Sequence, residues 1–322
     1  MPRVSIITPC YNGERYVGRT IESVRAQTFT DWEHVVVDDG SSDNSAAVIG
    51  VYAACDPRLW LIRQTNGGVS KARNSGLAAC SSDSDYLLFL DADDRLKPDM
   101  LAVMVRYLDA RTEVGLVYCA CVYIDSDDRV TGKKEMIRYV PASFGVFGVR
   151  ELPPDRPETP FVSTLAYAGV VPSVAVLRRS VYEITLGWDE TLGQPGEDVD
   201  LFLNMALRSK VHYVPQELVL YRQHGWQATS DRKRLDAQNK KLFHKWNSMS
   251  GISKDHKALV EEALTFRNER VIPYIRFKRN LTWGSDHLRA GSLVEGVKCY
   301  LRCLKDLVTQ TVRVQLVRRR NN

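Results

Sequence analysis

Three short acidic clusters carry the side chains in this chain that could do chemistry. They are Asp38-Asp39, Asp91-Ala92-Asp93-Asp94 and Glu197-Asp198. The first follows the apolar run His34–Val37 and the second follows Tyr86–Leu90, and both runs are typical of buried strands. Open α/β sheets bind ligands at the carboxyl ends of their strands. The first two clusters therefore predict a rim of carboxylates that suits a metal ion or a polar ligand.

The residues after the first predicted strand narrow the kind of nucleotide site. This segment is Pro9-Cys10-Tyr11-Asn12-Gly13 in place of G-x-G-x-x-G, and the motif G-x-x-x-x-G-K-[ST] occurs nowhere in the chain. Both motifs cradle phosphates on a glycine-rich backbone. With carboxylates at the rim instead, a diphosphate would be held through a divalent cation, and Mg²⁺ and Mn²⁺ both suit carboxylate and phosphate oxygens.

The elements that must position these side chains alternate regularly along the first part of the chain. The predicted strands are Val4–Thr8, Glu33–Asp38, Leu59–Arg63 and Tyr86–Leu90. The helices predicted between them are Glu14–Gln27, Asn44–Ala54 and Val69–Cys80. Parallel strands need crossover connections, so the pattern predicts an α/β fold with a Rossmann-like, mostly parallel sheet flanked by helices. Further on we expect a helix at Pro98–Arg111, a strand at Gly115–Ile124 and a mobile Pro-rich loop at Pro141–Pro160.

Composition predicts a cytoplasmic globular protein. The chain has 322 residues, of which 44% are apolar, enough for a substantial core. Its longest apolar stretch, Leu116–Ile124, falls far short of the roughly 20 residues that span a bilayer, and the N-terminus leads directly into a strand pattern. The seven cysteines include no C-x-x-C pair and are expected to be reduced thiols.

Charge divides the chain into two predicted domains. Residues 1–230 carry 23 basic and 30 acidic residues, whereas residues 231–322 carry 21 basic and 9 acidic residues, a balance of +12. The second part is predicted to be a basic helical C-terminal extension, with helices at Arg232–Met249, Lys254–Asn268 and Ser292–Thr309.

The last predicted helix is amphipathic. Its apolar stripe contains Val294, Val297, Leu301, Leu304 and Val308, and Lys298, Arg302 and Lys305 are expected to lie opposite that stripe. Such a helix can rest on an anionic membrane surface, or it can pack on the first domain or on a partner subunit in a homo-oligomer. Nucleic acid is not expected as a partner, because the basic residues follow no recognised binding motif.

Several segments together resemble the family 2 glycosyltransferases of the GT-A fold, in their broad bacterial branch. They are Val4–Asn12, Val36–Asp43, Asn66–Asn74, Phe89–Asp94, Gly187–Glu190, Gly196–Asp200 and Tyr221–His224. Their order and spacing make the resemblance specific, and it covers roughly residues 3–230, which it implies to be the catalytic domain. It implies an inverting, hexosyltransferase-type enzyme that uses a nucleoside-diphosphate sugar with Mn²⁺ or Mg²⁺. Glycans or lipid-linked glycans of cell-surface polysaccharide synthesis are the implied acceptors, at the inner face of the cell membrane.

The resemblance also implies roles at the cation site. The D-x-D motif Asp91-Ala92-Asp93 would hold the metal and the ribose, with Asp93 as the metal ligand and Asp91 at the ribose or the metal. His224 is a candidate for the metal or the diphosphate, although a lone histidine is as often structural. Arg222 is a comparable candidate for the diphosphate.

The base of the donor is expected to contact the first acidic cluster. By resemblance, Asp39 accepts a hydrogen bond from the uracil ring N–H, Tyr11 packs against the base, and Thr8 and Pro9 shape the base pocket. The expected donor is therefore a UDP-sugar. Asp38 belongs to the same predicted site, but on pattern alone either aspartate could simply cap the turn that follows.

Basic residues of the next segment could contact the diphosphate. Arg73 can pair with phosphate oxygens by a bidentate fork and Lys71 as a point charge, while Asn66 is expected to fix the loop geometry. The alternative for Lys71 is a solvated helix face.

The third cluster is expected to supply the catalytic base. A hydroxyl nucleophile must lose its proton as it attacks the anomeric carbon, and a positioned carboxylate can accept that proton. Asp198 is the predicted base and Glu197 its neighbour, at the start of a helix whose positive end favours the ionised carboxylate. The alternative is an acidic first helical turn without a catalytic role. At the level of the whole protein, the alternatives are a non-catalytic sugar-nucleotide-binding protein and a sugar nucleotidyltransferase.

Overall fold

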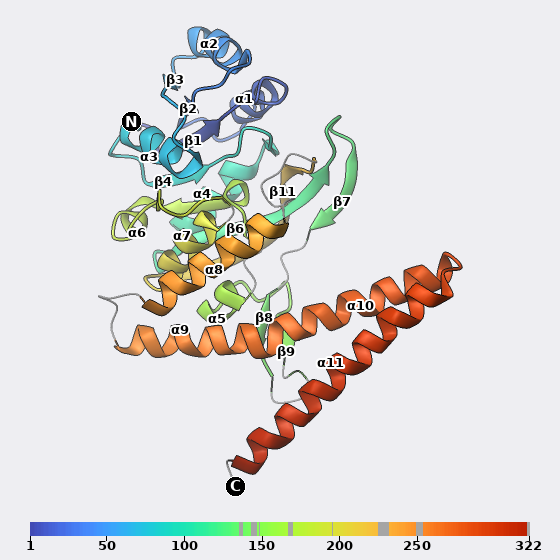
Figure 1. Ribbon diagram of the computed structural model, residues 1–322. Coiled ribbons are helices and arrows are strands. Elements are labelled where there is room, and N and C mark those ends of the chain that lie inside the picture. Colours follow the sequence, from blue (N-terminus) through green and yellow to red (C-terminus); the bar gives the residue numbers. More distant parts are fainter. Residues whose placement is uncertain are drawn as a thin grey trace. The chain divides into compact units, whose positions relative to one another are not determined.

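The structure is a computed structural model of the chain (Figure 1). It describes residues 1–134, 138–142, 147, 149–166, 170–194, 196–224, 232–248 and 254–320. Two compact units are present. The first comprises Met1–Met136, Pro153–Thr164 and Ala168–Gly251, and the second comprises Ile137–Leu152, Leu165–Tyr167 and Ile252–Asn322. The predicted division at residue 230, between a first domain and a basic helical extension, stays a prediction.

A mixed sheet forms the centre of the first unit. Its parallel half consists of β3 (Leu59–Arg63), β2 (Trp32–Asp38), β1 (Val4–Cys10) and β4 (Tyr86–Phe89), in that order. The sheet continues through β10 (Ala175–Arg178), β6 (Val114–Ile124), β11 (Lys210–Arg222) and β5 (Arg95–Leu96), while β7 (Val130–Lys134) pairs with β6. β10 runs antiparallel to both its neighbours, whereas β11 runs parallel to β6. The predicted α/β fold with a mostly parallel sheet is confirmed.

Helices cross over between these strands as expected. The longer ones are α1 (Val17–Arg25), α2 (Ser45–Cys55), α3 (Val69–Ala79) and α4 (Met100–Asp109). Each end lies within three residues of its predicted position. In α3, a Cβ at Gly76 would lie 2.5 Å from a methyl carbon of Ile7 and 3.0 Å from one of Val37. Glycine at this position therefore lets α3 approach β1 and β2 closely, which sets the start of α3 beside the sheet edge.

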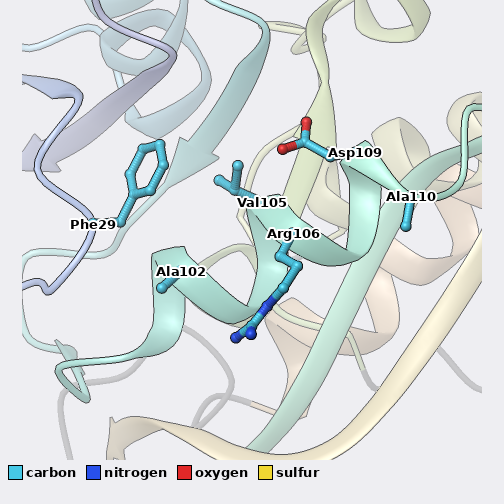
Figure 2. Close-up of a pocket in the computed structure, with 6 residues that line it drawn as sticks. All are labelled: Phe29, Ala102, Val105, Arg106, Asp109 and Ala110. Atoms are coloured by element: carbon cyan, nitrogen blue, oxygen red, sulfur yellow. The ribbon is translucent and has the colours of Figure 1, made fainter.

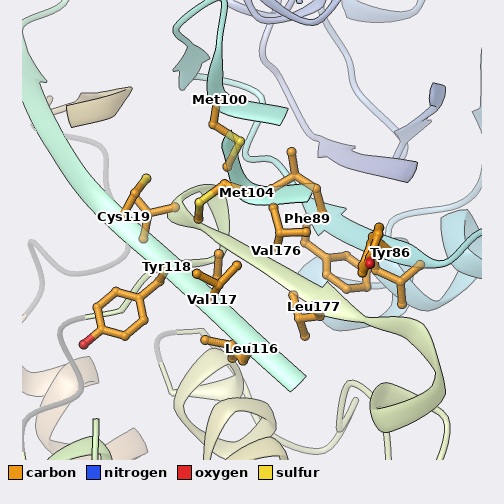
Figure 3. Close-up of a cluster of buried hydrophobic side chains, with 14 of the residues drawn as sticks. Tyr86, Phe89, Met100, Met104, Leu116, Val117, Tyr118, Cys119, Val176 and Leu177 are labelled. Atoms are coloured by element: carbon orange, nitrogen blue, oxygen red, sulfur yellow. The ribbon is translucent and has the colours of Figure 1, made fainter. Parts of the chain in front are cut away.

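The main hydrophobic core lies where α4 packs on the sheet. Figure 3 shows its side chains coming from β4, β6, β10 and α4. Those labelled there are Tyr86, Phe89, Met100, Met104, Leu116, Val117, Tyr118, Cys119, Val176 and Leu177. This core anchors the end of β4, from which the second acidic cluster follows.

Further helical segments complete the first unit, and one of them starts at the third acidic cluster. They are α5 (Phe161–Ala166), the 3₁₀ turn η1 (Pro172–Val174), α6 (Arg179–Tyr182) and α7 (Glu197–Ala206). The helix α8 (Arg232–Ser248) packs in this unit as well. The buried Asp200 carboxylate of α7 accepts hydrogen bonds from Lys245 Nζ at 2.7 Å and from Trp246 Nε1 at 2.9 Å. These charge-assisted bonds fix α7 against α8.

The second unit is mainly helical. It contains α9 (Lys254–Phe266), a π-helical turn η3 (Arg267–Val271), α10 (Ile272–Arg289) and α11 (Leu293–Arg320). Sequence reasoning did not predict α10. A small sheet pairs β8 (Tyr139–Pro141) with β9 (Val149–Glu151). The expectation of a loop throughout Pro141–Pro160 is therefore wrong in part, while residues 143–146 and 148 lie outside the described residues.

The two faces of α11 differ from the expectation. The predicted stripe is exposed, with Leu301 59% and Leu304 57% accessible to solvent. Up to Gln310, the part of α11 whose burial is described, the buried residues lie on the side opposite the stripe and are Gly296, Cys299, Cys303, Asp306 and Gln310. At 100° per residue, Lys298, Arg302 and Lys305 lie between these two faces. The expectation that they stand opposite the stripe is therefore wrong, because that side packs inside the unit. Among the described helices, none combines the length and the apolar character of a membrane-crossing span.

Candidate active site

A cavity of about 630 Å³ in the first unit brings the three acidic clusters together, and this volume is typical of ligand sites. It lies at the carboxyl ends of β1 and β4 and at the N-terminal ends of α3 and α7. The predicted site residues that line it are Pro9, Tyr11, Asp39, Asn66, Arg73, Asp91, Ala92, Asp93, Glu197, Asp198 and His224. Thr8, Asp38, Lys71 and Arg222 do not line it.

The loop after β1 forms one wall of the cavity and is tied to the segment after β2. Asn12 adopts a left-handed backbone with φ of 51°, which asparagine tolerates better than most residues. Its Oδ1 accepts a hydrogen bond from the Ser42 N–H, and its own N–H donates to Ser41 Oγ, both at 2.9 Å. These bonds hold Tyr11 at the rim, where its ring is 56% exposed. The predicted packing of Tyr11 on a base stays a prediction.

Asp39 organises the opposite loop. Its carboxylate is buried, with 3% exposure, and accepts hydrogen bonds from Gln64 Nε2 at 2.7 Å and from the N–H groups of Gly67 and Gly68 at 2.9 Å. These bonds fix the loop that contains Asn66, so the geometry predicted for Asn66 depends on Asp39. A contact between Asp39 and uracil remains a prediction. In such a contact, the Asp39 carboxylate would accept a hydrogen bond from uracil in addition to those from this loop.

Two predicted donor-site residues lie behind the cavity wall. Thr8 Oγ1 is 2.9 Å from His34 Nε2, and both side chains are fully buried. Asp38 Oδ1 accepts a hydrogen bond from the Ser41 N–H at 3.1 Å, and Oδ2 lies 3.5 Å from Arg63 Nε. Asp38 therefore caps the following turn, which is the alternative that the sequence left open.

The two basic residues outside the lining have different surroundings. Lys71 is exposed on α3. Arg222 is fully buried, and its guanidinium donates to the carbonyl oxygens of Asp93 at 2.9 Å and Asp125 at 2.6 Å and pairs with the Asp128 carboxylate. A direct contact of Arg222 with a diphosphate would require these bonds to break.

The turn after β4 concentrates negative charge. Thr20 Oγ1 lies 2.8 Å from the carbonyl oxygens of both Ala92 and Asp94, which fixes the turn to α1. Burial raises the pKa of Asp94 well above its usual range, and the charges of Asp93 and Asp91 add to this rise. Burial also raises the pKa of Asp91 against the opposing effect of Arg73. The site therefore favours the binding of a positively charged group or ion.

Arg73 connects the second and third acidic clusters. Its guanidinium is 2.9 Å from Asp91 Oδ1 and 3.0 Å from Glu197 Oε1, and its Cζ lies 4.1 Å from the centre of the Trp188 ring. The Arg73 side chain is only 1% exposed, and that of Glu197 is 3% exposed. This arginine, predicted to contact phosphate, is thus already engaged by two carboxylates, and it fixes the start of α7 beside the turn after β4.

Asp198 lies in the first turn of α7, next to Gly196, whose φ of 129° only glycine adopts readily. Its Oδ1 accepts a hydrogen bond from the Val199 N–H at 2.8 Å. Removal from water and, next, the neighbouring Glu197 charge raise the pKa of Asp198 to about 7. The expectation that the helix end favours the ionised form is outweighed by these two effects. A pKa near neutrality nevertheless suits a general base.

The donor set near Asp93 fits a divalent cation. Asp93 Oδ2 is 2.9 Å from His224 Nε2, so a carboxylate and an imidazole converge at the cavity wall. Among the described residues, no group of three His, Cys, Asp or Glu side chains is arranged to hold a metal by itself. Mg²⁺ and similar ions commonly take one or two protein ligands and complete their shell with phosphate oxygens and water. The carboxylates gathered at this turn have the chemistry that such an ion requires.

Sequence reasoning missed an aromatic residue at this wall. Tyr16 lines the cavity and stacks on His224, with ring centroids 5.7 Å apart and planes 14° apart. Arg222 Cζ lies 4.5 Å from the centre of the same ring. Its sequence position, at the start of the predicted helix Glu14–Gln27, gave no signal of this contact; in the structure Tyr16 is the residue that precedes α1.

A second hollow, of about 600 Å³, lies on α4 away from the acidic clusters (Figure 2). Its single carboxylate, Asp109, is held by Arg3 at 2.7 Å and by the Tyr86 hydroxyl at 2.6 Å. This hollow offers no group poised for chemistry among the residues that line it, which are Phe29, Ala102, Val105, Arg106, Asp109 and Ala110.

Comparison with known sequences identifies related proteins. A family model described as glycosyl transferase family 2 matches residues 5–185. An uncharacterised glycosyltransferase of Bacillus subtilis, EpsJ, is 37% identical over 131 residues, which are 41% of this chain and 37% of EpsJ. The chondroitin synthase of Escherichia coli is 38% identical over 123 residues, 38% of this chain and 17% of that protein. The alignments thus span little more than a third of EpsJ and less than a fifth of the synthase.

Solved structures with the same fold extend over nearly the whole chain. Staphylococcus aureus TarS 1–349 in complex with UDP-GlcNAc superposes with a TM-score of 0.60 at 17% identity, covering 98% of this chain and 92% of that chain. The mannosyltransferase PcManGT from Pyrobaculum calidifontis, in complex with GDP-Man and Mn²⁺, gives a TM-score of 0.61 at 18% identity, covering 97% and 86%. These likenesses confirm the GT-A fold.

Proposed function

The chain belongs to glycosyl transferase family 2, and we propose that it transfers a sugar from a UDP-sugar to a hydroxyl group of an acceptor, with inversion at the anomeric carbon. The observation that carries this proposal is the meeting of three acidic clusters in one cavity. Asp39 comes from the end of β2, Asp93 from the turn after β4, and Asp198 from the start of α7. A base site, a cation site and a general base are the parts that such a transfer needs.

In the proposed reaction, Asp198 acts as the general base. Its carboxylate accepts the proton of the acceptor hydroxyl while the hydroxyl oxygen bonds to the anomeric carbon. The bond from that carbon to the diphosphate breaks on the opposite side, and the diphosphate leaves with the electron pair. A single displacement of this kind inverts the anomeric centre. Glu197, which is anchored on Arg73, keeps the first turn of α7 in place.

Asp93 and His224 are the residues proposed to hold Mn²⁺ or Mg²⁺, with Asp91 at the ribose or the metal. When bound, the ion acts as a Lewis acid that neutralises the charge of the leaving diphosphate. The protein's own contribution is to place two donors 2.9 Å apart at the wall of the cavity. The Mn²⁺ in the PcManGT complex supports the use of a divalent cation.

A panel of sugar nucleotides tests the proposal. We expect a UDP-sugar with Mn²⁺ to raise the melting temperature more than GDP- or dTDP-sugars do. Ligand at 100 times its Kd stabilises by about 2.7 kcal/mol, which is roughly 5–11 °C for a unit of this size. A larger rise in melting temperature with GDP or dTDP donors would contradict the proposed contact between Asp39 and uracil. No rise with any donor would contradict the proposed function.

We propose a glycan or lipid-linked glycan as the acceptor. The name of the chondroitin synthase supports a polysaccharide product, as a property of that relative. A lipid-linked acceptor would be met at a membrane surface, and the exposed stripe of α11 with its basic flank has the character of an interfacial helix. Lys298, Arg302 and Lys305 supply the charge complementarity, and each such cation contributes about 1 kcal/mol near an anionic bilayer. Phospholipid headgroups are therefore the proposed occupant of this face.

Vesicle sedimentation tests this surface. The wild-type chain should bind vesicles that contain phosphatidylglycerol and not vesicles of phosphatidylcholine alone, and Leu301→Glu should abolish that binding. Leu186→Glu is the matched control, because Leu186 is similarly exposed (68%) but lies in the first unit. If the wild-type chain instead binds no vesicles and forms a concentration-dependent dimer that Leu301→Glu disrupts, the partner of this face would be a second copy of the chain and not a membrane.

A further inference from the structure

The turn between β6 and β7 carries one carboxylate that stands outside the cavity lining and yet pairs with three arginines. Asp128 has a left-handed backbone, with φ of 66°. Its carboxylate is 2.9 Å from Arg19 Nη1 of α1 and 3.2 Å from Arg95 Nη1 of β5, and it also pairs with Arg222 at the end of β11. Three separate elements thus converge on one side chain that is 23% exposed.

Besides the Arg222 guanidinium, which donates to the Asp125 carbonyl at 2.6 Å, the turn has hydrogen bonds of its own. Asp125 Oδ1 accepts hydrogen bonds from the N–H groups of Asp127 at 2.8 Å and Arg129 at 2.9 Å. The Asp125 N–H also donates to the Arg129 carbonyl at 2.9 Å. These local bonds build the turn. The charge of Asp128 is therefore directed at the arginines and not at the turn.

Of these arginines, Arg222 is hydrogen-bonded to the acidic turn after β4. Its Nε donates to the Asp93 carbonyl at 2.9 Å, and its backbone N–H donates to Asp94 Oδ1 at 2.8 Å. Its guanidinium lies over Tyr16. Because Arg222 is fully buried, its charge has to be matched by a nearby carboxylate.

Asp93 is consequently held at both ends. Its carbonyl oxygen is bound by Arg222, and its carboxylate lies 2.9 Å from His224. Arg222 and His224 both rest on the ring of Tyr16. Any change in the direction of the Arg222 guanidinium thus reaches the two side chains that form the cation site.

We propose that Asp128 is a positioning residue for the cation site, and that it acts through Arg222. The inference rests on the proposed function, in which Asp93 and His224 hold the metal. With Asp128 ionised, the guanidinium is neutralised on the side away from the cavity. Without that charge, the buried Arg222 guanidinium loses its paired carboxylate, and the bond through which it holds the Asp93 carbonyl, together with its position over Tyr16, is no longer fixed.

The test is Mn²⁺ binding by the full chain with UDP present, measured by calorimetry and by the electron paramagnetic resonance signal of free Mn²⁺. Asp128→Asn removes the charge while keeping a residue that tolerates the left-handed backbone. Loss of a residue that orients metal ligands typically weakens metal binding 10- to 100-fold, and we expect that range here. The matched control is Asp127→Asn in the same turn, whose carboxylate pairs with the exposed Arg15 and Arg129. It should bind Mn²⁺ within twofold of wild type.

Different failures have different meanings. Wild-type chain that binds no Mn²⁺ with UDP would contradict the proposed function itself. Normal wild-type binding together with unchanged Mn²⁺ affinity in a folded Asp128→Asn chain would overturn the role of Asp128, even if the variant unfolds at a lower temperature. If Asp128→Asn does not fold, Asp128→Glu displaces the carboxylate by one methylene. Mn²⁺ binding at least threefold weaker than in Asp127→Glu would support the proposal, and equal binding of the two variants would overturn it.

Discussion

Arg73 makes a quantitative prediction about the carboxylates of the cavity. Its guanidinium lies between Asp91 and Glu197, and the Arg73 and Glu197 side chains are 1% and 3% exposed. Removing one partner of a buried ion pair costs about 3–5 kcal/mol, because the other charge stays buried without compensation. Arg73→Met keeps an unbranched apolar chain against Trp188 and removes the charge together with the two guanidinium hydrogen bonds. For the first unit, this cost corresponds to a fall in melting temperature of roughly 6–20 °C.

Thermal unfolding at pH 7.5 without divalent cations measures this effect. The matched control is Lys71→Met on the same helix, where the side chain is exposed and a change within about 0.5 kcal/mol is expected. Adding Glu197→Gln to Arg73→Met should recover at least 1 kcal/mol, because the double variant no longer buries that uncompensated carboxylate. If Arg73→Met melted like the control, the carboxylates would not depend on Arg73, and its part in joining the second and third clusters would be refuted.

Three further predictions concern the ligands of the cavity. Burial raises the pKa of Asp198 to about 7, so the ionised base accumulates as pH rises. The kcat/KM of transfer should increase about tenfold per pH unit below 7 and level off above it; a flat profile between pH 5.5 and 8 would exclude Asp198 as the titrating base. His224→Ala should weaken Mn²⁺ binding at least tenfold by calorimetry, and an unchanged affinity would assign His224 a purely structural role. Asp39→Ala removes three hydrogen bonds from the loop at residues 64–68, and with about 1 kcal/mol for each we expect UDP binding to fall at least tenfold, whereas Asp31→Ala, on an exposed position before β2, should not change it.

The parallel half of the fold could be predicted from local patterns. β2 and β4 are buried along their whole length; β4 is a continuous apolar run and β2 contains Val35-Val36-Val37, so the sequence displays both strands directly. β10 has only four residues and pairs antiparallel with strands far away in the chain, so it is too short for a pattern of apolar residues to predict it. α10 was missed because Pro273 and Gly284 are breaker signals within its sequence, although it packs beside α11.

The candidate site was predictable where spacing alone fixes a position. Asp91 and Asp93 follow a strand, and every such residue at the edge of a parallel sheet points to the same rim. The surroundings of Thr8 and Arg222 could not be read in this way, because their partners His34 and Asp128 are brought to them by packing, whereas the capping by Asp38 of its local partner Ser41 was one of the two alternatives that the sequence offered. Packing also decides which face of α11 is buried. The sequence shows the apolar stripe, but it does not show that the opposite face is the buried one.

The central claim is that Asp198 is the base of a sugar transfer whose donor is bound by other residues. Donor hydrolysis with water as the acceptor, measured beside Mn²⁺-dependent binding of the same UDP-sugar, separates these two functions for Asp198→Asn. We predict donor binding within about twofold of wild type and turnover lower by 10²–10⁴-fold, the range for loss of a general base. Unchanged turnover, or a loss of turnover that follows entirely from lost donor binding, would contradict the account.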